Sequence, residues 1–197
     1  MLLAAGGSRR FGSAKLLARF GGEALLRRAV RAALGCRPGG CVVVLGARAH
    51  SHARVLRGYP VRVAINTRWR SGIASSLKTG IHALPPEAPA ALVVLADQIA
   101  VGPAELELVQ AAWRRHPGRL VAARAGDVRL PPAVLPRRVF AEVRRLRGDR
   151  GAGDLLRDTS RDVIEIEMLT AALDIDHRAD LQRFGRRQMR LAKLPNA

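Results

Sequence analysis

The chain has little of several features that mark particular classes of protein. Aromatic residues make up only 4% of its 197 residues, so few rings are available to stack on the bases of a single-stranded nucleic acid. The two cysteines, Cys36 and Cys41, fit neither a C-x-x-C pair nor a disulfide framework. No stretch approaches the roughly 18 consecutive apolar residues of a membrane span, and no signal peptide opens the sequence. We therefore expect a soluble, cytoplasmic protein with no membrane partner.

Acidic residues are scarce relative to basic ones. The sequence has 16 Asp and Glu against 34 Lys and Arg, a net charge of +18, and its only lysines are Lys15, Lys78 and Lys193. The arginines are spread along the chain without a block of about five or six like charges, which favours a compositional bias over a nucleic-acid-binding arm. A polyanion partner stays open as the alternative, and the charge would also help to attract a small anionic substrate. Nucleic acid is not the favoured partner.

Short apolar runs alternate with longer segments of helical periodicity. The runs predict strands over residues 1–5, 41–45, 61–65, 91–96, 120–123 and 163–166. The longer segments predict helices over residues 23–34, 50–57, 75–84, 103–115, 137–146, 153–157 and 178–184. This order is typical of an α/β fold, a Rossmann-like three-layer sandwich with a mostly parallel sheet. We expect one domain over residues 1–185 and a basic C-terminal tail over 186–197.

The loop after the first predicted strand carries phosphate-binding chemistry. A strand that stops at Gly6 and Gly7 leaves backbone N–H groups free to point at phosphate oxygens, and Arg10 and Lys15 add positive charge. The spacing matches neither a Walker A loop nor a G-x-G-x-x-G fingerprint. A tight turn with solvated charges is the alternative.

Other polar residues stand where a ligand could reach them. Asp97 follows a wholly apolar predicted strand, so its carboxylate either caps the next segment or holds Mg²⁺ against a triphosphate. Asn66 and Ser76 could reach a nucleobase and Gly72 would allow close approach of the backbone, although Ser76 could equally belong to a helix N-cap. Scattered histidines, His50 and His52 among them, lack the companions of a metal site.

Five ordered motifs give the sequence a resemblance to a known family. The loop L-A-A-G-x-S-x-R-x-G-x-x-K, from Leu3 to Lys15, resembles the signature of the MobA-like nucleotidyltransferases, and in particular that of the molybdenum cofactor cytidylyltransferases. Similar to further family motifs are N-x-x-W-x-x-G-x-x-x-S-L-x-x-G (66–80), L-A-D-Q (95–98), G-D-R-G-A (148–152) and D-I-D-x-x-x-D-L (174–181).

The resemblance implies a fold of the nucleotide-diphospho-sugar transferase type and Mg²⁺-dependent transfer of CMP from CTP to the phosphate of molybdenum cofactor, with release of pyrophosphate. It implies catalytic roles for Arg10, Lys15 and Asp97, and metal binding by Asp97 and Asp176, with Asp174 as an alternative second ligand. It also implies nucleotide binding by Leu3, Ala4, Ala5, Gly6, Gly7, Ser8, Asn66, Gly72 and Ser76. The implied partners are CTP or another NTP, the molybdenum cofactor, and a molybdenum hydroxylase or its chaperone as receiver of the product.

Ala5 bears on which nucleotide is used. Guanylyl-transferring relatives carry L-A-G-G where this chain has Leu3-Ala4-Ala5-Gly6. A methyl group beside the base would obstruct a two-ring purine, whereas a one-ring pyrimidine would clear it. The sequence therefore predicts a preference for CTP over GTP.

Three departures from the family pattern bear on the acceptor. Ile99 stands where proline is common, the stretch from Arg129 to Pro132 lacks the glycine of a G-x-P motif, and Gly153 replaces an arginine. Asp149 is either an acceptor-side residue or a turn former. Two alternatives therefore stay open: a nucleotidyltransferase acting on a sugar phosphate or another small phosphate, and a non-catalytic basic module that binds nucleotides or nucleic acid.

Overall fold

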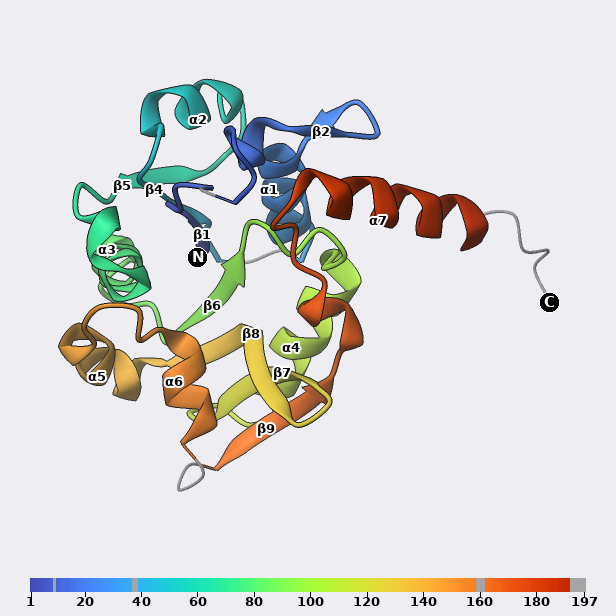
Figure 1. Ribbon diagram of the computed structural model, residues 1–197. Helices are drawn as coiled ribbons and strands as arrows, with labels where there is room; N and C mark the ends of the chain where they lie inside the picture. The colour runs from blue at the N-terminus through green and yellow to red at the C-terminus, as the bar shows by residue number, and fades with distance from the viewer. Residues whose placement is uncertain (9, 37–38, 159–161, 192–197) are drawn as a thin grey trace.

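The computed structural model describes residues 1–8, 10–36, 39–158 and 162–191. At its centre lies a seven-stranded sheet in the order β5-β4-β1-β6-β8-β7-β9 (Figure 1). The strands are β1 (Leu2–Ala4), β4 (Val42–Leu45), β5 (Arg62–Ile65), β6 (Ala90–Leu95), β7 (Leu120–Ala125), β8 (Val128–Pro136) and β9 (Val163–Glu167). Only β8 runs antiparallel to its neighbours in this described sheet. The predicted mostly parallel α/β fold is confirmed.

Helices cover both faces of the sheet and make it the middle of three layers (Figure 1). One face packs against α1 (Leu25–Gly35), α2 (Ala49–Val55) and α4 (Pro103–Arg115), and the other against α3 (Ile73–Ala83), α5 (Phe140–Arg145) and α6 (Ala152–Arg157). Side chains alternate along β1, so that Leu2 belongs to the first core and Leu3 to the second. Burial of both strand faces explains why these strands read as continuous apolar runs.

The strand β8 is absent from the sequence prediction, although it lies between β6 and β7 in the sheet. Proline argues against a central strand because it cannot donate to the ladder, and β8 contains Pro131, Pro132 and Pro136. The β7–β8 register shifts at this point: Ala122 pairs with Ala133 and Ala123 with Leu130, so Pro131 and Pro132 fall in the bulge between them. The bulge lets a central strand hold two prolines.

The end of the described chain also differs from the prediction. Helix α7 extends from Arg178 to Leu191, beyond the predicted end at Phe184, and so includes the first residues of the segment predicted as a tail. The rest of that segment, residues 192–197, lies outside the described residues. Phe184 stacks at a tilt on Phe20, with 5.3 Å between ring centroids, and Phe20 belongs to the short ribbon of β2 (Arg19–Phe20) and β3 (Glu23–Ala24).

Two further observations concern the cysteines and the apolar character of the helices. Cys36 and Cys41 are both buried free thiols, and burial raises the pKa of each. Within the described ranges, no helix has both the length and the apolar character needed to cross a bilayer.

Candidate active site

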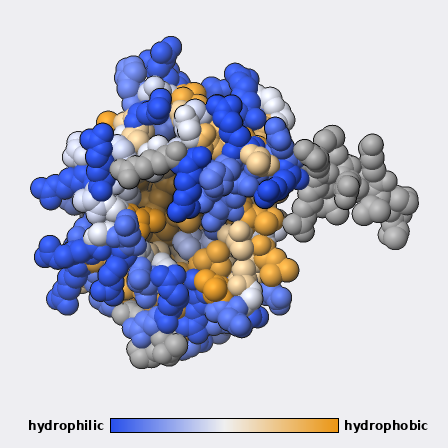
Figure 2. Space-filling model, viewed as in Figure 1, coloured by the Kyte–Doolittle hydropathy of each residue, from blue (hydrophilic) through white to orange (hydrophobic). Residues whose placement is uncertain are grey.

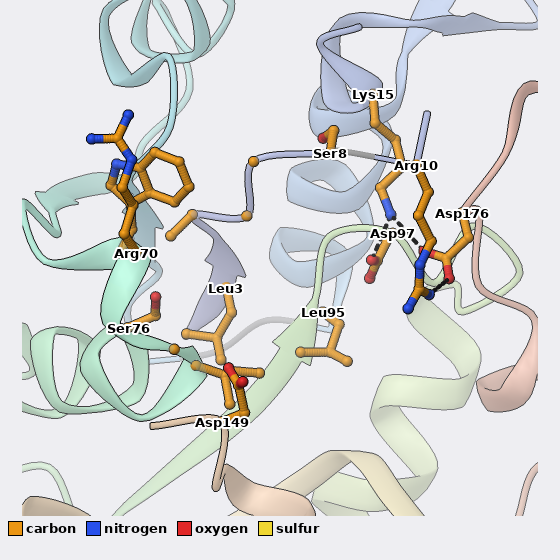
Figure 3. A pocket seen from close by; sticks show the side chains of 16 residues that line it. Leu3, Ser8, Arg10, Lys15, Arg70, Ser76, Leu95, Asp97, Asp149 and Asp176 are labelled. Carbon is orange, nitrogen blue, oxygen red and sulfur yellow. Dashed lines mark hydrogen bonds and ion pairs between the residues drawn. The ribbon is translucent and has the colours of Figure 1, made fainter. Parts of the chain in front are cut away.

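A cavity of about 500 Å³ opens at the carboxyl ends of β1 and β6. Parallel sheets of this kind hold their ligands outside the carboxyl ends of the strands. Figure 2 is viewed from the same side as Figure 1 and shows a central hollow with hydrophilic side chains above and to the left of it and hydrophobic ones at its lower right. The cavity is lined by Leu3, Ala5, Gly6, Gly7, Ser8, Arg10, Lys15, Trp69, Arg70, Gly72, Ile73, Ser76, Leu95, Asp97, Asp149 and Asp176 (Figure 3).

The glycine loop forms one wall of this cavity. Gly6 has open space around its Cα, so a ligand can come close to its backbone. Gly7 passes over the indole of Trp69: a Cβ at Gly7 would lie 2.9 Å from Cζ3 of that ring. Ser8 has a φ of 52°, the left-handed conformation, and its carbonyl accepts a hydrogen bond from Phe11 N at 3.2 Å. The loop therefore turns tightly and presents its backbone to the cavity.

Two cations and two carboxylates meet on the opposite side of the loop (Figure 3). Lys15 Nζ lies 2.9 Å from Asp97 Oδ2 and 3.4 Å from Asp176 Oδ1. Arg10 donates to the other oxygen of Asp176 at 2.9 Å. Lys15 is buried, at 8% exposure, whereas the side chain of Arg10 is 73% exposed. The buried lysine is therefore the main counter-ion of the carboxylate pair.

The third aspartate of this region has a different electrostatic environment. Burial, together with the charge of Asp97, raises the pKa of Asp174 to about 6 against the opposing effect of Lys15. Burial also opposes ionisation of Asp176, but the charges of Lys15 and Arg10 outweigh it and lower the pKa of that carboxyl. Asp97 and Asp176 both line the cavity, whereas Asp174 does not line it and is less acidic than Asp176.

The charged pair fits a hard divalent cation. Asp97 and Asp176 already converge on one positive charge, the ammonium of Lys15. Mg²⁺ takes one or two protein carboxylates and completes its shell with substrate phosphates and water. Among the described residues, no group of three or more His, Cys, Asp or Glu side chains is placed to hold a metal ion. The two carboxylates therefore suit a cation whose remaining ligands come from a bound phosphate ester and water.

The side chain of Gln98 ties the two acidic segments together. Gln98 is 4% exposed, and its Nε2 donates to the carbonyls of Pro131 at 2.6 Å and Ala171 at 2.7 Å. Its backbone bridges that of Asp174, and Ile175 N donates to Asp97 O at 3.1 Å. These bonds fix the segment that carries Asp176 against the end of β6.

Two of the residues predicted to bind the nucleotide lie outside the cavity of about 500 Å³ that contains these charges, the charged cavity. Asn66 is buried, at 3% exposure, and its Nδ2 donates to the hydroxyls of Ser75 at 2.8 Å and Ser76 at 2.9 Å. Its Oδ1 accepts from Arg68 N, so the amide supports the start of α3 and orients Ser76, which does line the cavity. Ala4 lines only an adjoining cleft of about 80 Å³, because its methyl points to the α1 side of the sheet.

Gly72 serves the packing of a neighbouring turn. It has a φ of 98°, and a Cβ there would lie 2.2 Å from the carbonyl carbon of Gly148. Ala74 N donates to Gly148 O at 3.1 Å across the same contact. Gly72 also lines the cavity, so its role toward a nucleotide stays a prediction, and its close contact with Gly148 positions the turn that brings Asp149 to the cavity.

Several lining residues were not predicted as ligand contacts. Trp69 and Arg70 belong to η2 (Trp69–Ser71), and the guanidinium of Arg70 lies over the Trp69 ring, 4.8 Å from its centroid. Ile73 and Leu95 add apolar surface. Asp149, which the sequence assigned either to the acceptor side or to a turn, lines the far side of the cavity (Figure 3). Trp69 stands inside a motif that the sequence showed, but a lone tryptophan is more often a packing residue than a ligand contact.

The three departures from the family pattern lie away from the cavity lining. Ile99 is buried in a small cluster with Phe11, Leu25 and Ile175. Gly153 lies in α6, where a Cβ would meet the guanidinium of Arg157. The stretch from Arg129 to Pro132 belongs to β8. None of the three departures alters the described wall of the charged cavity.

Comparisons with known proteins agree with this architecture. The profile of the MobA-like NTP transferase domain matches residues 1–163. The structure of Rv0371c from Mycobacterium tuberculosis is 25% identical, with a TM-score of 0.82 over 94% of this chain and 95% of that one. A manganese complex of Rv0371c has 23% identity and a TM-score of 0.79 over 94% and 96% of the two chains.

A further structural relative is named after the compound whose biosynthesis it serves. Molybdopterin-guanine dinucleotide biosynthesis protein A from Archaeoglobus fulgidus has 17% identity and a TM-score of 0.72, over 96% of this chain and 97% of that one. At this identity the likeness concerns the fold. Among curated proteins, none matches the sequence significantly.

Proposed function

Because the chain belongs to the MobA-like NTP transferase family, we propose that it transfers CMP from CTP to the phosphate of molybdenum cofactor and releases pyrophosphate. The observation that carries this proposal is the composition of one cavity. The open backbone of Gly6, the buried ammonium of Lys15 and the carboxylates of Asp97 and Asp176 all line it. These are the groups that recognise a triphosphate together with a divalent cation.

The reaction needs positioning and charge neutralisation more than covalent chemistry from the protein. A phosphate oxygen of the acceptor attacks the α-phosphorus of CTP, a new P–O bond forms, and the bond to the β-phosphate oxygen breaks as pyrophosphate leaves. The backbone N–H groups from Gly6 to Ser8 donate to the phosphates, and Lys15 and Arg10 offset their charge. Mg²⁺ held by Asp97 and Asp176 would neutralise further phosphate charge when bound. The manganese complex of Rv0371c supports a divalent cation in this fold.

The apolar side of the cavity suits the nucleoside. Leu3, Ala5, Trp69 and Ser76 line it, and Ala5 is buried, so its methyl cannot move aside easily. A Cβ at Gly46 would lie 2.8 Å from the Ala5 Cβ, which shows how closely the backbone packs behind that methyl. A cavity narrowed at this position favours the one-ring base of CTP over the two-ring base of GTP.

The choice of molybdenum cofactor as the acceptor is supported by the resemblance of the L-A-A-G loop, from Leu3 to Gly6, to that of the cytidylyltransferases. Arg70 and Asp149 are the charged groups on the part of the cavity away from the carboxylate pair, where they can meet the polar groups of the acceptor (Figure 3). The cytosine dinucleotide form of the cofactor would then pass to a molybdenum hydroxylase or its chaperone.

The test is pyrophosphate release with each of ATP, CTP, GTP and UTP in the presence of Mg²⁺, with and without molybdenum cofactor. We expect release with CTP and the cofactor together, and its loss on addition of EDTA. Parallel reactions with sugar 1-phosphates test the alternative acceptor class. Turnover of a sugar phosphate but not of the cofactor would reassign the acceptor, and no turnover with any triphosphate would contradict the proposed function.

A further inference from the structure

The ammonium of Lys15 occupies the space between the two carboxylates that suit a metal ion. Its Nζ lies 2.9 Å from Asp97 Oδ2 and 3.4 Å from Asp176 Oδ1 (Figure 3). These oxygens come from segments 79 residues apart in sequence, yet they converge on one cation. A second cation between the same oxygens would meet the ammonium at close range, and like charges repel strongly in a partly buried site.

Burial makes Lys15 different from the other cation of the site. The Lys15 side chain is 10% exposed, and a buried ammonium is stable only while it is paired. The Arg10 side chain is mostly exposed and can leave Asp176 for water at little cost. Displacement of Lys15 from the carboxylates is therefore unfavourable unless another anion takes their place.

The phosphate loop offers that second place. Lys15 also lines the small cleft next to the charged cavity, and it shares this cleft with Gly6, Ser8 and Asp97. A triphosphate held against the backbone of the loop would bring anionic oxygens into the same space. The lysine thus stands between two sets of negative charge, one provided by the protein and one by the substrate.

We propose that Lys15 is the resident counter-ion of Asp97 and Asp176 in the ligand-free protein, and that it exchanges these carboxylates for the triphosphate when nucleotide and divalent cation bind together. This inference rests on the proposed function of the cavity. The binding of nucleotide and the binding of metal are then reciprocally coupled. The metal displaces the Lys15 ammonium from the carboxylates, and the triphosphate supplies the anionic oxygens that pair with it instead. Metal alone is expected to bind weakly to the wild-type protein.

The exchange has a distinctive consequence for variants of Lys15. Lys15→Met keeps an unbranched side chain, shorter by one heavy atom, but removes its charge, so it frees the carboxylates and removes a partner of the triphosphate. We expect Mn²⁺ alone to bind about tenfold more tightly than to wild type, and CTP to bind more weakly. Lys15→Arg keeps the charge and is expected to leave binding of Mn²⁺ alone weak.

The experiment is titration of Mn²⁺, followed by electron paramagnetic resonance of the free ion, with and without a non-hydrolysable CTP analogue. Lys78→Met is the matched control, because Lys78 lies on α3 outside the charged cavity. The double variant Lys15→Met/Asp97→Asn is expected to lose the gain in affinity, which locates the ion at this carboxylate pair. A thermal melt of each variant checks that it is folded, and Lys15→Gln replaces Lys15→Met if that variant is not.

Unchanged or weaker binding of Mn²⁺ to a folded, uncharged Lys15 variant would overturn the proposed exchange, as would equal gains in Lys15→Met and Lys15→Arg. The proposed function fails on a different result, namely the absence of CTP binding to the wild-type protein in the presence of Mn²⁺. The titrations of metal alone do not depend on that result.

Discussion

The two ends of the central sheet each carry a cavity of similar size but of different chemistry. The cavity at the carboxyl ends of the strands measures about 500 Å³ and contains Lys15, Arg10, Asp97 and Asp176. The other measures about 460 Å³ and is lined largely by apolar groups, including Leu84, Leu92 and Trp113. Size alone therefore does not locate the function. Parallel strands gather the loop-borne polar groups at one end and leave the other end to packing.

The largest expected effect follows from the charge of Asp97. Asp97→Asn keeps the shape of the side chain but removes the charge that a hard cation needs, so kcat for pyrophosphate release should fall by at least about 10³-fold. Asp176→Asn should be milder, because Asp176 is more exposed and is proposed as the second ligand, a place where an amide oxygen can still coordinate. Both variants should remain folded, with a lower unfolding midpoint for Asp97→Asn because the buried ammonium of Lys15 loses its nearer charged partner. Full activity in Asp97→Asn would remove the metal assignment.

The apolar end should respond to mutation in the opposite way. Trp113→Ala deletes a ring packed against the core at that end and should lower the free energy of unfolding by about 3 kcal/mol, with KM for CTP unchanged. Trp113→Phe is the matched control: it keeps a ring and removes a buried indole N–H that has no hydrogen-bond partner among the described residues. Urea denaturation and steady-state kinetics measure the two quantities. A change in KM for CTP in folded Trp113→Ala would break the distinction between the two ends.

A single methyl group should set the choice of base within the charged cavity. Ala5→Gly should raise kcat/KM for GTP about tenfold relative to CTP, because it removes the methyl that a purine would meet. Ala4→Gly is the matched control, since the same methyl one residue earlier belongs to the opposite core. The measurement is competition between CTP and GTP at equal concentration. An unchanged base preference in Ala5→Gly, or an equal change in Ala4→Gly, would refute the steric explanation.

The smallest expected effect concerns His52, which is buried on α2 away from both cavities. Its exposure is 2%, and burial and Arg48 lower its pKa from 6.5 against the opposing effect of the Ala47 backbone. Below about pH 6.5 the unfolded chain binds a proton that the folded protein resists, so stability should fall as the pH drops. His52→Leu should flatten this dependence by about 1 kcal/mol between pH 7 and pH 5. Denaturation at both pH values measures it, and an unchanged slope would contradict the assignment.

Much of the fold was predictable because strands buried on both faces leave continuous apolar runs, as in β4 and β6. The strand β8 was not predictable, because proline normally argues against a central strand. The bulge against β7 accommodates Pro131 and Pro132, and the sequence does not show where a bulge will form. The length of α7 was underestimated because its last turns follow Gly185 and are rich in arginine, a composition that is also typical of a poorly ordered tail.

The candidate site was predictable where its residues lie within loops at the strand ends. Lys15, Asp97 and Asp176 converge in space although they are far apart in sequence. At Asn66 and Gly72 the sequence shows only polarity and a missing side chain, which do not tell whether a partner within the chain, a substrate or both contact these positions. Here the partners are Ser76 and the Gly148 turn. Only tertiary contacts separate these cases.

Mass spectrometry of the product tests the central claim most directly. The protein is incubated with Mg²⁺, molybdenum cofactor and equal concentrations of CTP and GTP, and the cofactor is then analysed for an added nucleotide, with Asp97→Asn as the inactive control. We expect a cofactor carrying one cytidylyl group, formed by the wild-type protein and not by Asp97→Asn. An unmodified cofactor, or one that carries predominantly a guanylyl group, would contradict the proposal.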